Sequence, residues 1–157
     1  MQDQQSNIQT TRFLDIHALQ ASDKDSQVIS TNGYDALTIY GAVEDTSQVF
    51  TAANRVDFTL FHGDTETTAD MTAVEAKDVV GYWGSGGVVY SLNQAGSSTV
   101  PSSSAGIAFA LGYIGGKKYI YLQVSREGTV TQTPQIFAIA VQGIASYSEK
   151  YAKVDWD

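Results

Sequence analysis

Hydrophobic and polar residues alternate along several short segments of this chain, and residues 55–62 give the clearest example. In an extended chain, successive side chains point to opposite sides, so Val56, Phe58 and Leu60 share one side while polar Asp57 lies on the other. This period of two residues is typical of a β-strand with one face toward a core. We therefore predict an antiparallel strand here.

Similar short runs recur along the chain and are separated by residues that favour turns. They predict strands at residues 13–17, 28–31, 36–43, 55–62, 79–83, 88–92, 106–114, 118–125 and 136–142. Asn32 and Gly33 form a strong turn signal, and residues 71–76 fit either a strand or a helical turn. Short strands with turn residues between them predict an all-β fold, either an antiparallel β-sandwich or a β-barrel.

The two ends of the sequence lack this alternation. Residues 1–11 are polar and aperiodic, and we interpret them as a flexible N-terminal arm. The β domain is predicted to cover residues 12–143. Residues 144–157 are predicted to form a C-terminal tail with spaced aromatic residues.

Composition and charge narrow the possible functions. The 157 residues include no cysteine, which excludes thiol catalysis, disulfides and cysteine-based zinc sites. A formal charge of -8 disfavours nucleic-acid binding, because the phosphate backbone repels an acidic surface. The apolar runs are too short to span a bilayer, and the polar N-terminus does not resemble a signal peptide. We expect no nucleic-acid partner and no membrane partner.

The run LGYIGGKKYIYLQV, which starts at Leu111, holds two adjacent lysines behind a glycine pair. A phosphate-binding loop would need glycine at Leu111, serine or threonine at Lys118, and a helix afterwards. All three requirements fail. We interpret Gly115 and Gly116 as a two-residue hairpin turn with positive φ angles, and Lys117 and Lys118 as charges that begin the next strand.

Candidate catalytic and metal-binding residues are few. His62 and Asp64 could pair as a base and its orienting group, but such a histidine more often ends a strand and satisfies a turn. Asp23 with Asp25, and Asp64 with Glu66, have the spacing of calcium ligands without the rest of that motif. We expect no enzymatic activity, no metal and no cofactor.

Three tyrosines flank the glycine pair and suggest an interaction surface. Tyr119 and Tyr121 share one face of their predicted strand, whereas Ile120 and Leu122 share the other. If the aliphatic pair faces the core, Tyr119 and Tyr121 form an outward stripe of the kind enriched at interfaces. The alternative is a second apolar layer that packs under a loop of the same chain.

Residues 112–122, GYIGGKKYIYL, resemble the signature G-Y-[IV]-G-G-K-R-Y-[VI]-R-V of small proteins that tailed phages encode beside the major capsid protein. In that group an earlier strand resembles residues 56–64, and a following segment resembles residues 71–74. A final apolar strand corresponds to residues 136–143, so the resemblance covers roughly residues 35–143.

The resemblance implies a virion structural protein, specifically a capsid decoration (cement) protein on the outer surface of the capsid. It implies binding to the major capsid protein and a homotrimer at three-fold or quasi-three-fold axes. The chain departs from the signature at Lys118, where arginine is usual, and at Tyr121, where a second basic residue is common. The residues that we expect to contact partners are Tyr113, Lys117, Lys118, Tyr119 and Tyr121.

Two other hypotheses stay open. The protein could be a tail, neck or head-fibre component of the virion, and it could bind host glycans through an aromatic platform such as Tyr82 or Trp83. A glycosidase that uses two carboxylates is the third and weakest hypothesis, because seventeen acidic residues allow many pairs and select none.

Overall fold

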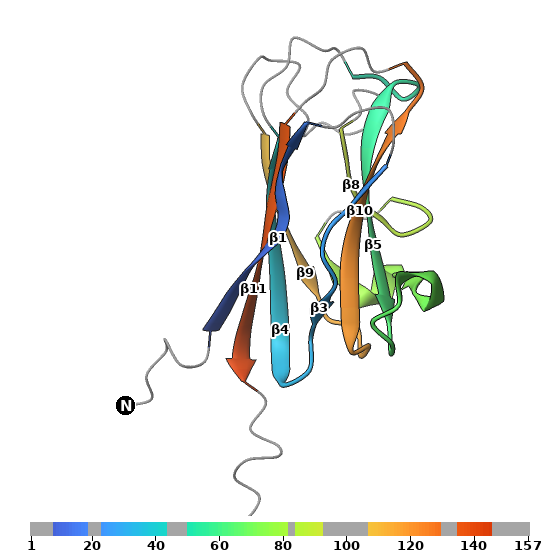
Figure 1. The fold of residues 1–157 in the computed structure, drawn as a ribbon. Helices are drawn as coiled ribbons and strands as arrows, with labels where there is room; N and C mark the ends of the chain where they lie inside the picture. The colour runs from blue at the N-terminus through green and yellow to red at the C-terminus, as the bar shows by residue number, and fades with distance from the viewer. Residues whose placement is uncertain are drawn as a thin grey trace, which may run out of the picture.

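The protein is an antiparallel β-sandwich, in which two sheets pack face to face around an apolar core (Figure 1). This architecture comes from a computed structural model, which describes residues 8–18, 23–43, 50–81, 84–92, 107–129 and 135–145. The predicted all-β fold is confirmed, and of its two forms the sandwich is the one that the chain adopts. No helix in these ranges is long and apolar enough to cross a membrane.

The sheets consist of the strands predicted from the alternating runs, together with shorter ones. The strands are β1 (Ile8–Ala18), β2 (Lys24–Asp25), β3 (Ile29–Ser30), β4 (Tyr34–Val43), β5 (Arg55–Gly63), β6 (Thr72–Ala73), β7 (Val79–Val80), β8 (Val88–Leu92), β9 (Ile107–Tyr113), β10 (Tyr119–Glu127) and β11 (Gln135–Ala145), with short 3-10 helices η2 (Thr68–Asp70) and η3 (Ala76–Asp78). Sheet A has the order β1-β11-β4-β9-β7. Sheet B has the order β2-β10-β5-β6, with β3 also paired to β10 and β8 to β5.

The core lies between the sheets and is built from alternate residues of the long strands. On β5, Val56, Phe58 and Leu60 are 0 to 1% exposed, as the alternation predicted. Ile120 and Leu122 of β10 are fully buried beside them, on the strand that pairs with β5. Each such side chain contributes about 1.5–3 kcal/mol by leaving water, so this layer holds the two sheets together.

The predicted boundaries of the arm and the tail need correction. Strand β1 begins at Ile8, inside the predicted arm, and pairs with β11 from Ile8 opposite Gly143 to Thr11 opposite Ala140. Strand β11 continues to Ala145, inside the predicted tail. A polar segment can serve as an edge strand because the neighbouring strand satisfies its backbone, and side-chain periodicity does not reveal this. Residues 1–7 and 146–157 lie outside the described ranges.

The prediction of a hairpin at the glycine pair is wrong. Strand β9 pairs with β4 and β7 in sheet A, whereas β10 pairs with β5 in sheet B, so residues 114–118 cross from one sheet to the other. Gly115 and Gly116 are not among the glycines with positive φ. The turn predicted at Asn32 and Gly33 is confirmed, since Gly33 has a φ of 86° between β3 and β4.

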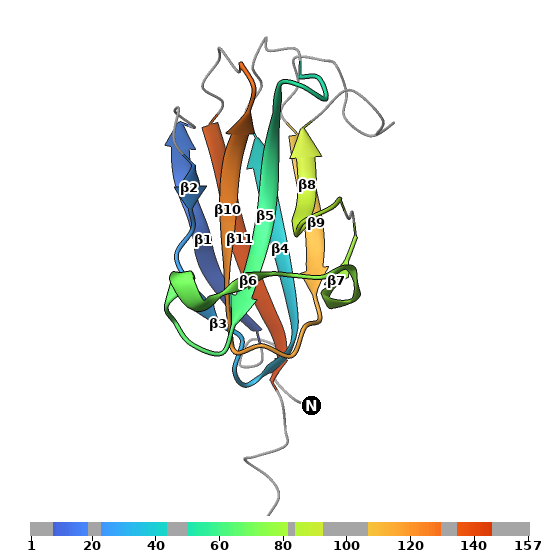
Figure 2. The same cartoon turned by 90° about the vertical axis from the view of Figure 1, so that its right-hand side faces the viewer.

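The segment between β5 and β8 covers part of the outer face of sheet B. In Figure 2 this segment passes in front of β5 as β6 and then reaches β7, which belongs to sheet A. Residues 71–76, which fitted a strand or a helical turn, contain the two-residue strand β6 and the start of η3. Sheet B therefore carries a partial second layer on its outer side.

Candidate partner-binding site

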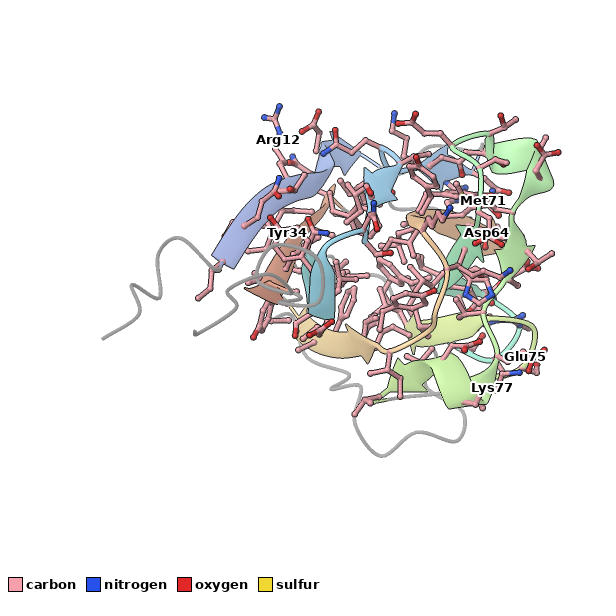
Figure 3. All side chains as sticks on the ribbon, turned by 90° about the horizontal axis from the view of Figure 1, so that it is seen from below. Arg12, Tyr34, Asp64, Met71, Glu75 and Lys77 are labelled. Atoms are coloured by element: carbon pink, nitrogen blue, oxygen red, sulfur yellow. The ribbon has the colours of Figure 1, made fainter. Side chains whose placement is uncertain are left out.

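The segment that crosses between the sheets, residues 114–118, lies at one end of the sandwich. Figure 3 views the molecule from this end and shows the crossing segment passing between the two sheets, close to Asp64. We call residues 114–118 the crossing segment. It carries both adjacent lysines of the chain, and three sets of contacts fix its path.

The Tyr113 side chain is the first of these contacts. Tyr113 is the last residue of β9 and is only 3% exposed. Its hydroxyl lies 3.0 Å from His62 Nδ1 and accepts a hydrogen bond of 3.3 Å from the Lys117 amide. The rings of Tyr113 and His62 meet edge to face, with centroids 5.9 Å apart. Tyr113 thus links both sheets and the crossing segment through one oxygen atom.

Burial keeps both of these rings uncharged at neutral pH. Loss of solvent raises the pKa of Tyr113 to about 12. Loss of solvent also lowers the pKa of His62, and the charge of nearby Asp78 only partly opposes this. A neutral phenol that accepts from the Lys117 amide can donate its own proton to His62 Nδ1, so the one hydroxyl serves both contacts.

Hydrogen bonds to the backbone of the crossing segment also hold it in place. Thr31 accounts for two of them: its hydroxyl donates to the Lys117 carbonyl at 2.6 Å, and its amide donates to the Lys118 carbonyl at 2.8 Å. The Ile114 amide donates to the Asp78 carbonyl at 2.8 Å. The segment is therefore tied to the turn between β3 and β4 on one side and to η3 on the other.

Gly115 is required by this arrangement. A Cβ atom at this position would lie 2.5 Å from the Tyr113 hydroxyl, which is closer than real Cβ contacts. A Cβ at Gly116 would meet nothing within 4 Å. The glycine pair therefore allows the chain to pass over a buried tyrosine, and only the first glycine is needed for that.

The two lysine side chains extend from this fixed backbone into solvent. Lys117 Nζ lies 2.6 Å from Asp64 Oδ2, and both side chains are about half exposed. This hydrogen bond lowers the pKa of the Asp64 carboxyl group. Lys118 is exposed as well. The end of the sandwich thus presents basic groups on a backbone with little freedom to move.

A shallow depression of about 260 Å³ adjoins the lysines. The turn between β3 and β4 forms one wall, and the crossing segment forms the other. Its volume is below that of ordinary small-molecule sites. A depression of this size accommodates one side chain of a protein partner.

The predicted contact residues divide into two groups. Lys117 and Lys118 are exposed and Tyr119 is half-buried, so these three are accessible to a partner. Tyr113 is buried, and Tyr121 is 6% exposed and stacks on Phe61 with ring centroids 4.9 Å apart. The outward tyrosine stripe is therefore wrong for Tyr121, which belongs to a second apolar layer, and Tyr113 positions the crossing segment without reaching the surface.

The candidate catalytic and metal-binding residues do not come together in one site within the described ranges. His62 Nδ1 contacts Tyr113, and Asp64 pairs with Lys117, so the two do not form a base and its orienting group. Within the described ranges, no three His, Asp or Glu side chains gather closely enough to hold a metal ion. Tyr82 and Trp83, the suggested glycan platform, lie outside those ranges.

Sequence reasoning missed Thr31, which holds two carbonyls of the crossing segment from 86 residues away. Nothing near Thr31 in the sequence marks this role, because the contact depends on how the sheets are paired.

Comparison of the chain with known protein families and with curated proteins finds no match.

Proposed function

We propose that this protein is a capsid decoration (cement) protein of a tailed phage, which binds the outer surface of the major capsid protein and stabilises the DNA-filled head. The observation that carries the proposal is the crossing segment, where Lys117 and Lys118 extend from a backbone fixed by Tyr113 and Thr31. This is the same run that resembles the signature of phage head proteins. The contact with the shell would be made through this end.

The rigidity of the segment supports such a role. A binding loop that is already ordered loses little conformational entropy when it docks, so more of its contact energy appears as affinity. Repetition on a symmetric shell then adds many modest contacts. A homotrimer at three-fold or quasi-three-fold axes would present three copies of the lysine pair together.

The distribution of charge supports the same orientation. The chain as a whole carries a formal charge of -8, whereas its two adjacent lysines lie at this end. Lys117 is paired with Asp64 and Asp35 lines the adjoining depression, so this end offers positive groups for local pairing with acidic side chains of a partner rather than a net basic surface. The proposal therefore requires an acidic patch on the outer face of the shell.

Charge reversal at Lys117 and Lys118 tests the proposal. Shells that lack the protein are incubated with purified chain and sedimented, and the bound protein is quantified. We expect Lys118→Glu to weaken binding at least tenfold and the double variant with Lys117→Glu to abolish it. The matched control is Lys77→Glu, because Lys77 is an exposed lysine on η3 that pairs with exposed Glu75 and lies outside the crossing segment.

Equal binding of the Lys118→Glu variant, the double variant and the Lys77→Glu control would contradict the proposed orientation. Failure of the unmodified protein to bind shells at low and high salt would contradict the proposed function. Counting copies in the virion separates the proposal from the tail, neck or fibre alternative, because decoration requires hundreds of copies and those parts require a handful.

A further inference from the structure

The turn between β3 and β4 presents the dipeptide Asn32-Gly33 at the end of the sandwich that carries the crossing segment (Figure 1). The Tyr34 amide donates to the Thr31 carbonyl at 3.2 Å, which closes a turn with Asn32 and Gly33 at its two central positions. Gly33 has a φ of 86°, a conformation that glycine adopts at little cost. The turn therefore holds the backbone on both sides of an exposed asparagine.

An asparagine that precedes glycine is chemically reactive. The backbone nitrogen of the following residue can reach the side-chain carbonyl carbon of the asparagine and close a five-membered ring. A side chain on that following residue would crowd the attack, and glycine has none. Asparagine is one of the thermolabile residues of proteins. Of the four asparagines in this chain, only Asn32 is followed by glycine.

The structure leaves both reacting groups accessible. Asn32 and Gly33 are exposed, and a Cβ atom at Gly33 would meet nothing within 4 Å, so there is room for the ring. Within the described ranges, neither the Asn32 side chain nor the Gly33 amide takes part in a hydrogen bond. The ring can therefore close without first breaking a hydrogen bond to these parts of the chain.

We propose that Asn32 is a site of self-modification, at which the chain converts its own asparagine into aspartate or isoaspartate through a cyclic imide with Gly33. The Gly33 amide loses its proton to a base in the solvent, and its nitrogen forms a bond to Asn32 Cγ. The bond between Cγ and Nδ2 breaks, and Nδ2 takes a proton from solvent and leaves as ammonia. Water then adds to one of the two carbonyl carbons of the imide, and the bond from that carbon to the ring nitrogen breaks.

The carbon that water attacks decides the product. Attack at Cγ breaks the new bond and leaves an ordinary aspartate. Attack at the main-chain carbonyl carbon leaves isoaspartate, in which the chain continues through Cβ and Cγ and the turn is longer by one methylene group. Either product carries a carboxyl group that is ionised at neutral pH, because the usual pKa of such a group is about 3.9. The formal charge of -8 therefore becomes more negative by one.

The new carboxylate would lie at the proposed contact with the shell. Asn32 lines the same depression as Lys117 and Lys118. The neighbouring Thr31 donates hydrogen bonds to the carbonyls of both lysines, which keeps the turn and the crossing segment together. A carboxylate at residue 32 competes with acidic groups of a partner for the two lysines, so the modification weakens that contact. This consequence rests on the proposed function, whereas the chemistry at Asn32 does not.

Peptide mapping of the full chain after prolonged incubation in mildly alkaline buffer tests the inference. We expect Asn32 to lose its amide at least tenfold faster than Asn54, which serves as the internal control. The Asn54 side chain accepts a hydrogen bond of 2.7 Å from the Thr129 amide, and the next residue is Arg55 rather than glycine. The product at Asn32 should include isoaspartate, detected by enzymatic methylation of its free carboxylate.

The matched variant is Asn32→Gln, which keeps the amide group on a longer side chain. Glutamine would have to close a six-membered ring, so this variant should not form the acidic species that isoelectric focusing detects in the unmodified protein. The rate at Asn32 should rise with pH, because the Gly33 nitrogen attacks only after it has lost its proton.

Equal rates at Asn32 and Asn54 would overturn the inference. Conversion of Asn32 to aspartate with no isoaspartate would also overturn it, because direct hydrolysis of the amide gives only aspartate. The effect on the contact is measured with Asn32→Asp, which should bind shells at least threefold more weakly than Asn32→Gln. Equal binding of these two variants would contradict that effect, and failure of the unmodified protein to bind shells would contradict the proposed function; in both cases the peptide map still decides the chemistry at Asn32.

Discussion

Replacing Tyr113 with phenylalanine removes one oxygen atom from the point where the two sheets and the crossing segment meet. The ring and its edge-to-face contact with His62 would remain, so the substitution isolates the hydroxyl. His62 Nδ1 would lose its partner at a residue that is 8% exposed, and the Lys117 amide would lose its acceptor.

The expected cost follows from these two losses. A buried polar group left without a partner costs about 1–3 kcal/mol, whereas the partly buried Lys117 amide can recover a bond with water at a cost of about 0.5 kcal/mol. Phenylalanine offsets some of this because it buries no hydroxyl. We expect Tyr113→Phe to lower the free energy of unfolding by about 2 kcal/mol and the melting temperature by about 4–8 °C.

Urea denaturation of the two proteins measures this difference. The midpoint should fall with an unchanged m value, since the folded state stays as compact. The control is Tyr121→Phe, because Tyr121 stacks on Phe61 while its hydroxyl forms no hydrogen bond within the described ranges, so its loss should cost less than about 0.5 kcal/mol. A Tyr113→Phe midpoint equal to that of the Tyr121→Phe control would refute the role given to Tyr113.

Three further predictions concern the folded body. Because burial lowers the pKa of His62, the unfolded chain binds a proton at a pH where the folded protein does not. The free energy of unfolding should therefore fall as the pH drops below about 6.5, by up to ~1.4 kcal/mol per pH unit. His62→Asn should reduce this slope in urea titrations at several pH values. Gly41→Ala would place a Cβ 2.1 Å from Phe109 Cζ and should cost about 1–3 kcal/mol, with a loss of near-ultraviolet circular dichroism; an unchanged midpoint would contradict this packing. Ser91→Ala removes a 2.5 Å hydrogen bond to buried Asp57 and should cost about 1–3 kcal/mol by thermal melting, whereas exposed Ser85→Ala should cost almost nothing.

The alternation of side chains allowed the fold class and the long strands to be predicted. Val56, Phe58 and Leu60 repeat every second residue, and all three lie in the core. The same pattern placed Asp57 on the side away from Val56, Phe58 and Leu60, and there it is only 6% exposed because β8 lies beside β5 and Ser91 donates to its carboxylate. Periodicity identifies which residues share a side, but it does not determine what covers that side.

The crossing segment marks the limit of local reasoning about the site. The local sequence, a strand followed by a glycine pair and a second strand, looks the same whether the chain turns back on itself or passes to another sheet. The difference lies in partners far along the chain, since β9 pairs with β4 and β10 with β5. For this reason the exposure of Lys117 and Lys118 could be predicted, whereas the burial of Tyr113 could not.

Cryo-electron microscopy of shells incubated with the purified protein is the most direct test of the central claim. The decoration role predicts added density on the outer surface at three-fold or quasi-three-fold positions, with the end that carries Lys117 and Lys118 against the shell. An unchanged outer surface at saturating protein would contradict the role, and density with this end directed into solvent would contradict the binding site.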